Sequence, residues 1–276
     1  RAPPCSSLFP YTTLFRSVPI FATGSLAGQR ANDNVSLADV AALKASTPDS
    51  ILVDAGGSLH GTTVASMTGG MDMLSSFSAA GYDLQAFGAE DLAYGISRLR
   101  SDANMGSGPS LAANLRDSDG AAIFYRSTSW NRNRITNGMN YVITRAGYRI
   151  GFFSLADADT VNNKISLVNE ETPFANDLTQ TASEQVAALQ AQGVDAIICI
   201  ATPGMDTAAL QTTLKDLGVT AIVDGSSSAS GQDTLYRAGA ALGLDGVARF
   251  DLVFTQGGGV AVRGADTVTE IGRAHV

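Results

Sequence analysis

The sequence predicts a layered α/β domain, with mixed β-sheets flanked by helices. Three observations indicate this class. Between residues 18 and 115, short apolar runs alternate with segments of helical periodicity, as in βαβ units. Segment 195–201 (DAIICIA) is apolar at nearly every position, which is typical of a strand buried on both faces. Segments 141–155 and 248–263 read as antiparallel hairpins that turn at glycines, so the sheets cannot be purely parallel.

The first half of the chain supplies the βαβ units. A helix begins at Ser36, with apolar residues on one face, and ends before Pro48. A second helix is closed by Gly81. The elements expected in this half are strands at 18–22, 51–53, 83–87 and 110–115, and helices at 36–47, 71–80 and 96–104.

The second half is richer in β-branched and aromatic residues. Gly147 lies at the turn of one expected hairpin, and glycines 257–259 at the turn of another. The expected strands are 121–130, 141–145, 149–155, 195–201, 220–223, 234–238, 248–254 and 260–263, the last three antiparallel, and the expected helices are 174–192 and 206–217.

The two ends of the chain do not look like protein sequence. Residues 8–17 read LFPYTTLFRS and residues 271–276 read IGRAHV, and the two adapters of a common sequencing library encode these strings. We therefore expect 1–17 and 270–276 to be translated adapter, and 18–269 to be one domain from a longer protein. The alternative, that Leu8–Pro10 belong to a signal peptide, requires a coincidence at each end.

Composition excludes several classes of function. The net charge is −8, which disfavours nucleic acid and anionic membrane as partners. No apolar run approaches the roughly 18–20 residues of a membrane span. Outside the expected adapter tails the chain has one cysteine, Cys199, and one histidine, His60. An internal disulfide and a histidine-rich metal site are therefore both excluded for 18–269.

Five loops follow expected strands at their carboxyl ends, where sites form in α/β folds. Their sequences are TGSLAG at 23–28, DAGGSLHG at 54–61, GAEDLAYG at 88–95, ATPGM at 201–205 and DGSSSAS at 224–230. A further segment, 112–117, reads AANLRD, and AGA at 238–240 precedes FDL at 250–252. In order and spacing these resemble the motifs H-T-N-D-x-H-G, D-A-G-D-x-x-x-G, G-N-H-E-F-D-Y-G, T-H-x-G, G-G-H-S-H, S-A-N-x-x-D and A-G-x-x-G…D-L.

Those motifs belong to the metallophosphatase domain of the 5′-nucleotidase, 2′,3′-cyclic phosphodiesterase and UDP-sugar hydrolase family. The resemblance covers nearly all of 18–269 and implies a four-layer α/β sandwich. In the family, seven ligands hold two metal ions that activate water and bind the phosphoryl oxygens. The resemblance places these ligand positions at Ser25, Ala27, Gly57, Ala89, Thr202, Ser226 and Ser228. It places two assisting residues, His and Asp in the family, at Glu90 and Ala93.

None of the seven positions holds Asp, Asn or His, and neutral hydroxyls do not replace those ligands at useful affinity. We therefore expect a catalytically degenerate domain without a cofactor, acting as a noncatalytic binding or structural module. The resemblance implies a larger extracellular, periplasmic or cell-surface protein, in which a C-terminal nucleotidase domain would be a partner. The second hypothesis is an active, metal-dependent nucleotide phosphohydrolase whose ligands come from other positions.

Several polar residues remain in the five loops: Asp54, His60, Glu90, Asp91 and Asp224. A divalent cation on these carboxylates is one alternative. We favour simpler roles, in which Asp54 and Asp224 accept backbone N–H groups at strand ends. Glu90 and Asp91 would then face solvent, and His60 would be a surface or hydrogen-bonding residue.

A serine hydrolase is a further alternative, with a nucleophile at Ser25, Ser58 or 226–228 and with His60 and Asp54 completing a triad. The loops lack the G-x-S-x-G pattern, which disfavours it. Cys199 lies in an apolar strand and is expected to be an inert core residue. The aromatic residues Phe124, Tyr125 and Trp130 are expected to serve packing rather than a ligand surface.

Overall fold

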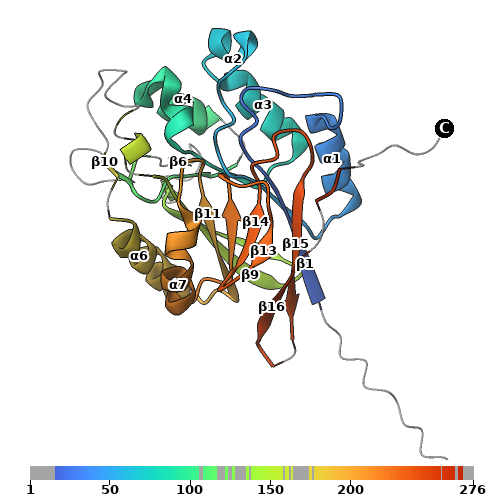
Figure 1. Ribbon diagram of the computed structural model, residues 1–276, viewed down its shortest axis with the longest axis vertical. Helices are drawn as coiled ribbons and strands as arrows, with labels where there is room; N and C mark the ends of the chain where they lie inside the picture. The colour runs from blue at the N-terminus through green and yellow to red at the C-terminus, as the bar shows by residue number, and fades with distance from the viewer. Residues whose placement is uncertain are drawn as a thin grey trace, which may run out of the picture.

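The protein folds as two β-sheets packed face to face, with helices on both outer faces (Figure 1). The structure is a computed structural model that describes residues 16–105, 108–116, 122–123, 126–127, 135–136, 138–157, 159–161, 163, 174–175, 177–255, 257–264 and 267–269. Helix, sheet, sheet and helix make four layers. The predicted α/β sandwich with mixed sheets is confirmed.

The first sheet has six strands in the order β16-β15-β1-β2-β3-β4. Strands β1 to β4 run parallel, and the hairpin of β15 and β16 adds two antiparallel strands beside β1. The strand bounds are β1 Arg16–Thr23, β2 Ile51–Asp54, β3 Leu84–Ala86, β4 Ser110–Leu111, β15 Ala248–Phe254 and β16 Val260–Gly264.

The second sheet also has six strands, in the order β13-β14-β12-β11-β9-β8. Its four central strands are parallel, and an antiparallel strand closes each edge. The bounds are β8 Asn140–Arg145, β9 Tyr148–Leu155, β11 Ala196–Ala201, β12 Ala221–Asp224, β13 Gly231–Gln232 and β14 Tyr236–Gly239. Two small pairs complete the strands: β5 Leu115–Arg116 with β10 Phe174–Ala175, and β6 Arg126–Ser127 with β7 Ile135–Thr136.

Helices cover the two outer faces (Figure 1). On the first sheet lie α1 Leu37–Ser46, α3 Met71–Ala80, the short 3₁₀ helix η1 Ala89–Tyr94 and α4 Ile96–Met105. The short helix α2 Thr63–Thr68 contacts α3 and projects beyond it at the top of Figure 1. On the second lie α6 Leu178–Ala191 and α7 Thr207–Leu217. Ser36 begins α1 with a capping box, because its hydroxyl accepts from Asp39 N while the Asp39 carboxylate accepts from Ser36 N.

Alternation along the strands separates the apolar core into three clusters. On β11, Ile198 and Ile200 face the first sheet, whereas Ile197 and Cys199 face α6 and α7. This period of two is what a strand covered on both faces requires. Cys199 is therefore the buried core residue expected from the sequence, and burial raises the pKa of its thiol.

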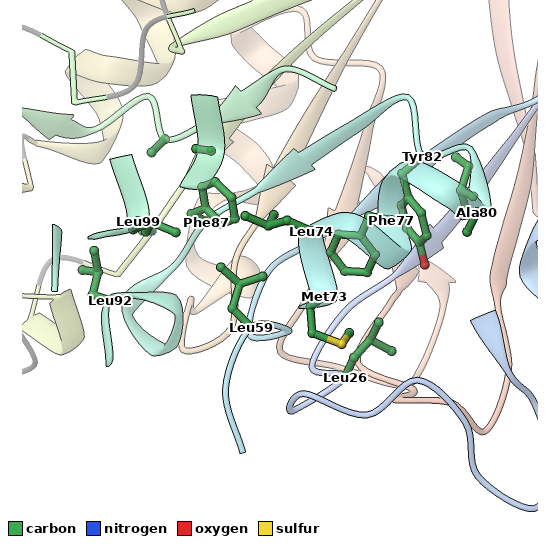
Figure 2. Close-up of a cluster of buried hydrophobic side chains, with 14 of the residues drawn as sticks. Leu26, Leu59, Met73, Leu74, Phe77, Ala80, Tyr82, Phe87, Leu92 and Leu99 are labelled. Carbon is green, nitrogen blue, oxygen red and sulfur yellow. The ribbon is translucent and has the colours of Figure 1, made fainter. Parts of the chain in front are cut away.

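The outer cluster on the first sheet also anchors three loops. Figure 2 shows Leu26, Leu59 and Leu92 within this cluster, beside Met73 and Phe87. The three leucines belong to the loops after β1, β2 and β3. Each is at most 2% exposed. These loops are therefore fixed by buried side chains rather than lying free on the surface.

Three expected elements are corrected by the structure. The strand expected at 110–115 is interrupted, because Asn114 turns aside and its amide exchanges two hydrogen bonds with the backbone of Ala156. The helix expected from 174 begins at Leu178, because Asp177 caps it by accepting from Gln180 N at 2.8 Å. Strand β14 joins the second sheet parallel to β12, instead of pairing with the antiparallel hairpin, because the loop and β13 return the chain in the original direction.

Two short helices, α2 and η1, are not predicted from the sequence. Helix α2 has six residues and η1 is a 3₁₀ turn, so neither is long enough to show helical periodicity. Thr62 at the N-cap and left-handed Gly69 at the C-cap are the signals that could have revealed α2. Of the strand expected at 121–130, only Arg126–Ser127 is described as strand, and Phe124, Tyr125 and Trp130 lie outside the described residues.

Strand β1 begins at Arg16, two residues earlier than the expected domain. Arg16 and Ser17 are exposed and pair with Phe254 and Val253 of β15. The assignment of 1–17 and 270–276 to adapter stays a prediction. Within the described ranges, no helix combines the length and apolar composition that a bilayer span requires.

Candidate functional site

The five loops singled out in the sequence lie at the carboxyl ends of β1, β2, β3, β11 and β12. They also contact one another across the two sheets. The loop after β1 runs alongside the loop after β2, and three backbone hydrogen bonds join them. Ser25 N, Ala27 N and Gly28 N donate to the carbonyls of residues 56, 57 and 58. Ser25 and Ala27 adopt left-handed conformations, with φ of 55° and 50°. Residues with a side chain disfavour the left-handed conformation, so these hydrogen bonds hold the backbone in it.

Asp54 lies at the end of β2, buried beneath these loops. Its carboxylate accepts from the hydroxyls of Thr23 at 2.9 Å and Ser58 at 3.0 Å, and from Gly56 N at 3.0 Å. Thr23 in turn bonds the Tyr82 hydroxyl at 2.8 Å. Burial, with the nearby charge of Asp91, raises the pKa of Asp54 to about 8, although the three hydrogen bonds oppose the shift. The strand-end role predicted for Asp54 is confirmed.

Asp91 joins the loops after β2 and β3. Its carboxylate accepts four backbone N–H groups: Gly57 at 2.8 Å, Ser58 and Gly88 at 3.0 Å, and Leu59 at 3.2 Å. The residue is 1% exposed, so the expectation that Asp91 faces solvent was wrong. No local pattern in the sequence indicates this burial, because the N–H groups come together only when the two loops are folded. Burial raises the pKa of Asp91, and the four donors oppose that shift.

His60 and Glu90 lie on the same two loops, nearer to solvent. His60 Nε2 is 3.1 Å from Glu90 Oε2, and their side chains are 27% and 35% exposed. His60 is thus partly exposed, which agrees with the surface role expected of it. This pairing does not form the triad considered above, since Ser58 donates to Asp54 while His60 pairs with Glu90.

Asp224 plays the same part on the second sheet that Asp54 plays on the first. It is 1% exposed and accepts from Ser226 N at 2.8 Å, which confirms its strand-end role. The Thr207 hydroxyl donates to it at 2.8 Å, and Arg237 pairs with it at 3.0 Å. Thr207 and Arg237 were not singled out from the sequence, because the contacts come from α7 and β14.

The loop after β11 closes onto the loops of the first sheet. A Cβ placed on Gly57 would lie 2.9 Å from Cγ of Pro203, and one placed on Gly225 would lie 2.9 Å from Cδ of the same ring. A Cβ on Gly88 would lie 2.7 Å from Oγ1 of Thr202. Such distances are below van der Waals contact, so Pro203 and Thr202 pack directly against glycine backbone of the facing loops.

Solved structures with this architecture identify the fold. No family model matches the chain, and no curated protein matches it. A calcineurin-like phosphoesterase of Bacillus subtilis, YfkN, superposes with a TM-score of 0.68 at 16% identity, over 91% of this chain and 89% of that chain. The chain has the calcineurin-like phosphoesterase fold. The likeness of fold implied by the loop motifs is therefore confirmed.

Two further structures extend this comparison. The 5′-nucleotidase precursor of Thermus thermophilus superposes with a TM-score of 0.70 at 16% identity, over 92% of this chain and 54% of that chain. The sulfate thiohydrolase SoxB of the same organism superposes with a TM-score of 0.73 at 14% identity, over 96% and 58%. The chain thus spans little more than half the length of those two chains.

The seven positions at which the loop motifs imply metal ligands fall into two sets, which differ in burial. Gly57, Ala89 and Thr202 are buried and Ser25 is half-buried, all where the loops meet, while Ala27, Ser226 and Ser228 are exposed. Within the described part of the chain, no three Asp, Glu, His or Cys side chains are grouped so that they could hold a metal ion. The buried carboxylates of Asp54, Asp91 and Asp224 instead accept hydrogen bonds from the protein. The side chains present do not fit a two-metal centre.

Proposed function

We propose that this domain is a catalytically degenerate, 5′-nucleotidase-type metallophosphatase domain that serves as a noncatalytic binding or structural module of a larger secreted protein. The observation that carries the proposal is the packing of Pro203 against Gly57 and Gly225. By the loop motifs, Gly57 takes the place of an aspartate metal ligand. In this chain that place has no side chain, and a proline ring from the facing loop lies against it.

The chemistry of the remaining groups supports the same proposal. Two-metal hydrolysis requires anionic or imidazole ligands that hold the ions and lower the pKa of a bound water. The carboxylates near the five loops accept backbone N–H and hydroxyl groups, which would have to be given up before a cation could bind. The chain spans 54% of the nucleotidase chain, which is consistent with a further domain in the full-length protein.

The test combines metal content with turnover. The full chain is purified, incubated with Mn²⁺, Zn²⁺, Mg²⁺ or Ca²⁺, desalted and measured by mass spectrometry for bound metal. Phosphate release is then followed from AMP, a 2′,3′-cyclic nucleotide and UDP-glucose, with an active 5′-nucleotidase assayed in parallel. We expect substoichiometric metal and no turnover above the buffer rate. Stoichiometric Mn²⁺ or Zn²⁺ with turnover would show that the alternative, an active nucleotide phosphohydrolase, is correct.

A further inference from the structure

We propose that Ser25, Pro203 and Ser226 form a metal-free clasp, which cross-links the loops of the two sheets. The proposal deepens the noncatalytic function above and rests on it. Two of the three residues, Ser25 and Ser226, occupy positions aligned with metal ligands, and Pro203 directly follows a third, Thr202. These positions have therefore not merely lost ligands, because the new residues hold the loops together themselves.

The first arm of the clasp is Ser25. Its hydroxyl donates to the carbonyl of Gly225 at 3.2 Å, which connects the loop after β1 in the first sheet with the loop after β12 in the second. The backbone of Ser25 is simultaneously bonded to Gly56 at 2.8 Å. One residue thus ties three loops, which is the task that a bridging metal ion would otherwise perform.

Pro203 is the centre of the clasp. Its ring lies between Gly57 of the first sheet and Gly225 of the second, in contact with the backbone of both. A Cβ on Gly57 would also lie 3.6 Å from the Ser25 hydroxyl, so the ring and the first arm share one packed junction. Proline suits this place because its ring is rigid and loses no side-chain entropy on burial.

The second arm is Ser226. Its hydroxyl accepts from Gly204 N at 2.9 Å and donates to the carbonyl of Thr202 at 3.4 Å. It therefore bonds the residues on both sides of Pro203 and fixes the proline in the loop after β11. The N–H of Gly225 adds a bond to Ala201 O at 2.7 Å beside it.

Hydrogen exchange of the full chain tests whether the loops are closed without metal. Exchange is measured by mass spectrometry on peptides covering 23–28, 54–61 and 201–205, in EDTA and in excess Mn²⁺. We expect slow exchange in EDTA and the same rates in Mn²⁺, because Ser25 N, Ala27 N and Thr202 N already have acceptors. Fast exchange in EDTA, or slowing by Mn²⁺, would overturn the proposal.

Substitutions test the named residues. Ser25→Ala and Ser226→Ala should each lower the Tm by about 2–4 °C, the shift expected for a net hydrogen bond in a domain of this size. The matched control is Ser228→Ala, at an exposed ligand-aligned position in the same loop, which should leave the Tm unchanged. Pro203→Gly should raise exchange in 54–61 by about tenfold while the core peptide 196–201 stays protected. Unchanged exchange of peptide 54–61 in Pro203→Gly, or equal Tm values for all three serine variants, would contradict the proposed clasp.

The clasp and the proposed function can fail separately. Turnover with bound metal would reject the noncatalytic function, whatever the exchange rates of the loops. Fast exchange in EDTA without turnover would reject the clasp while leaving the domain noncatalytic.

Discussion

The carboxylate of Asp91 accepts the backbone N–H of Gly57 at 2.8 Å, across the gap between the loops after β3 and β2. Three further N–H groups bind the same carboxylate, so one buried side chain determines the path of the residues around Gly57. Buried donors that lose their acceptor retain the cost of desolvation. Asp91 is thus the residue on which the loop after β2 most depends.

Replacing Asp91 by alanine should therefore destabilise the domain strongly. We expect Asp91→Ala to lower the free energy of unfolding by about 3–5 kcal/mol, because four buried N–H groups lose their acceptor together. Urea unfolding followed by circular dichroism measures this. The control is the neighbouring Glu90, whose partly exposed carboxylate pairs with His60, so Glu90→Ala should cost at most about 1 kcal/mol. Equal losses for the two variants would contradict the role given to Asp91.

The sequence predicted the fold well because the signals it uses are local. A run that is apolar at nearly every position predicted β11, a capping serine predicted the start of α1, and glycines predicted the ends of α3 and α7. The roles of Asp54 and Asp224 followed from their places at strand ends. The burial of Asp91 and the packing of Pro203 could not be predicted, because both depend on contacts between loops that are far apart in the chain. Loop motifs predict the order of residues along the chain, but they do not predict the distances between loops.

The buried carboxyl of Asp54 should make stability depend on pH. Its pKa is about 8 in the folded protein and 3.8 when exposed. Between these values the folded chain holds a proton that the unfolded chain has lost, so this contribution to stability falls as pH rises from about 4 through 8. The slope is at most about 1.4 kcal/mol per pH unit.

The variant Asp54→Asn isolates this contribution, because the amide stays neutral at every pH. We expect the free energy of unfolding of the native chain, minus that of the variant, to fall between pH 4 and 8 and to level off above about pH 9. Urea titrations at unit pH intervals measure the difference. A difference that stays constant over this range would show that Asp54 is ionised throughout.

Ala27 is a place where glycine should stabilise the protein. It is exposed, with a φ of 50°, a conformation that costs an alanine about 1 kcal/mol or more but costs glycine little. Ala27→Gly should raise the free energy of unfolding by up to about 1 kcal/mol, even though glycine gains more entropy on unfolding. The exposed Ala187 in helix α6 is the matched control, since Ala187→Gly should cost about 1 kcal/mol. Loss of stability in both variants would contradict the strain assigned to the loop after β1.

Gly57 and Pro203 should show an energetic coupling that backbone strain alone does not produce. Gly57 has a φ of 70° and Gly193 a φ of 68°, but only at Gly57 would an added Cβ meet a neighbour, the Pro203 ring at 2.9 Å. Gly193→Ala therefore measures the cost of the left-handed backbone, about 1 kcal/mol. Gly57→Ala should cost clearly more, since the ring must also move.

A double-mutant cycle separates the two costs. In a Pro203→Gly background the steric conflict disappears, so Gly57→Ala should cost about as much as Gly193→Ala. The expected coupling energy between positions 57 and 203 is more than about 0.5 kcal/mol, the usual limit for independent sites. If the effects of the two substitutions were additive, the Pro203 ring would not be in contact with Gly57. The expected coupling also implies that introducing an acidic side chain at position 57 destabilises the domain unless Pro203 is replaced at the same time.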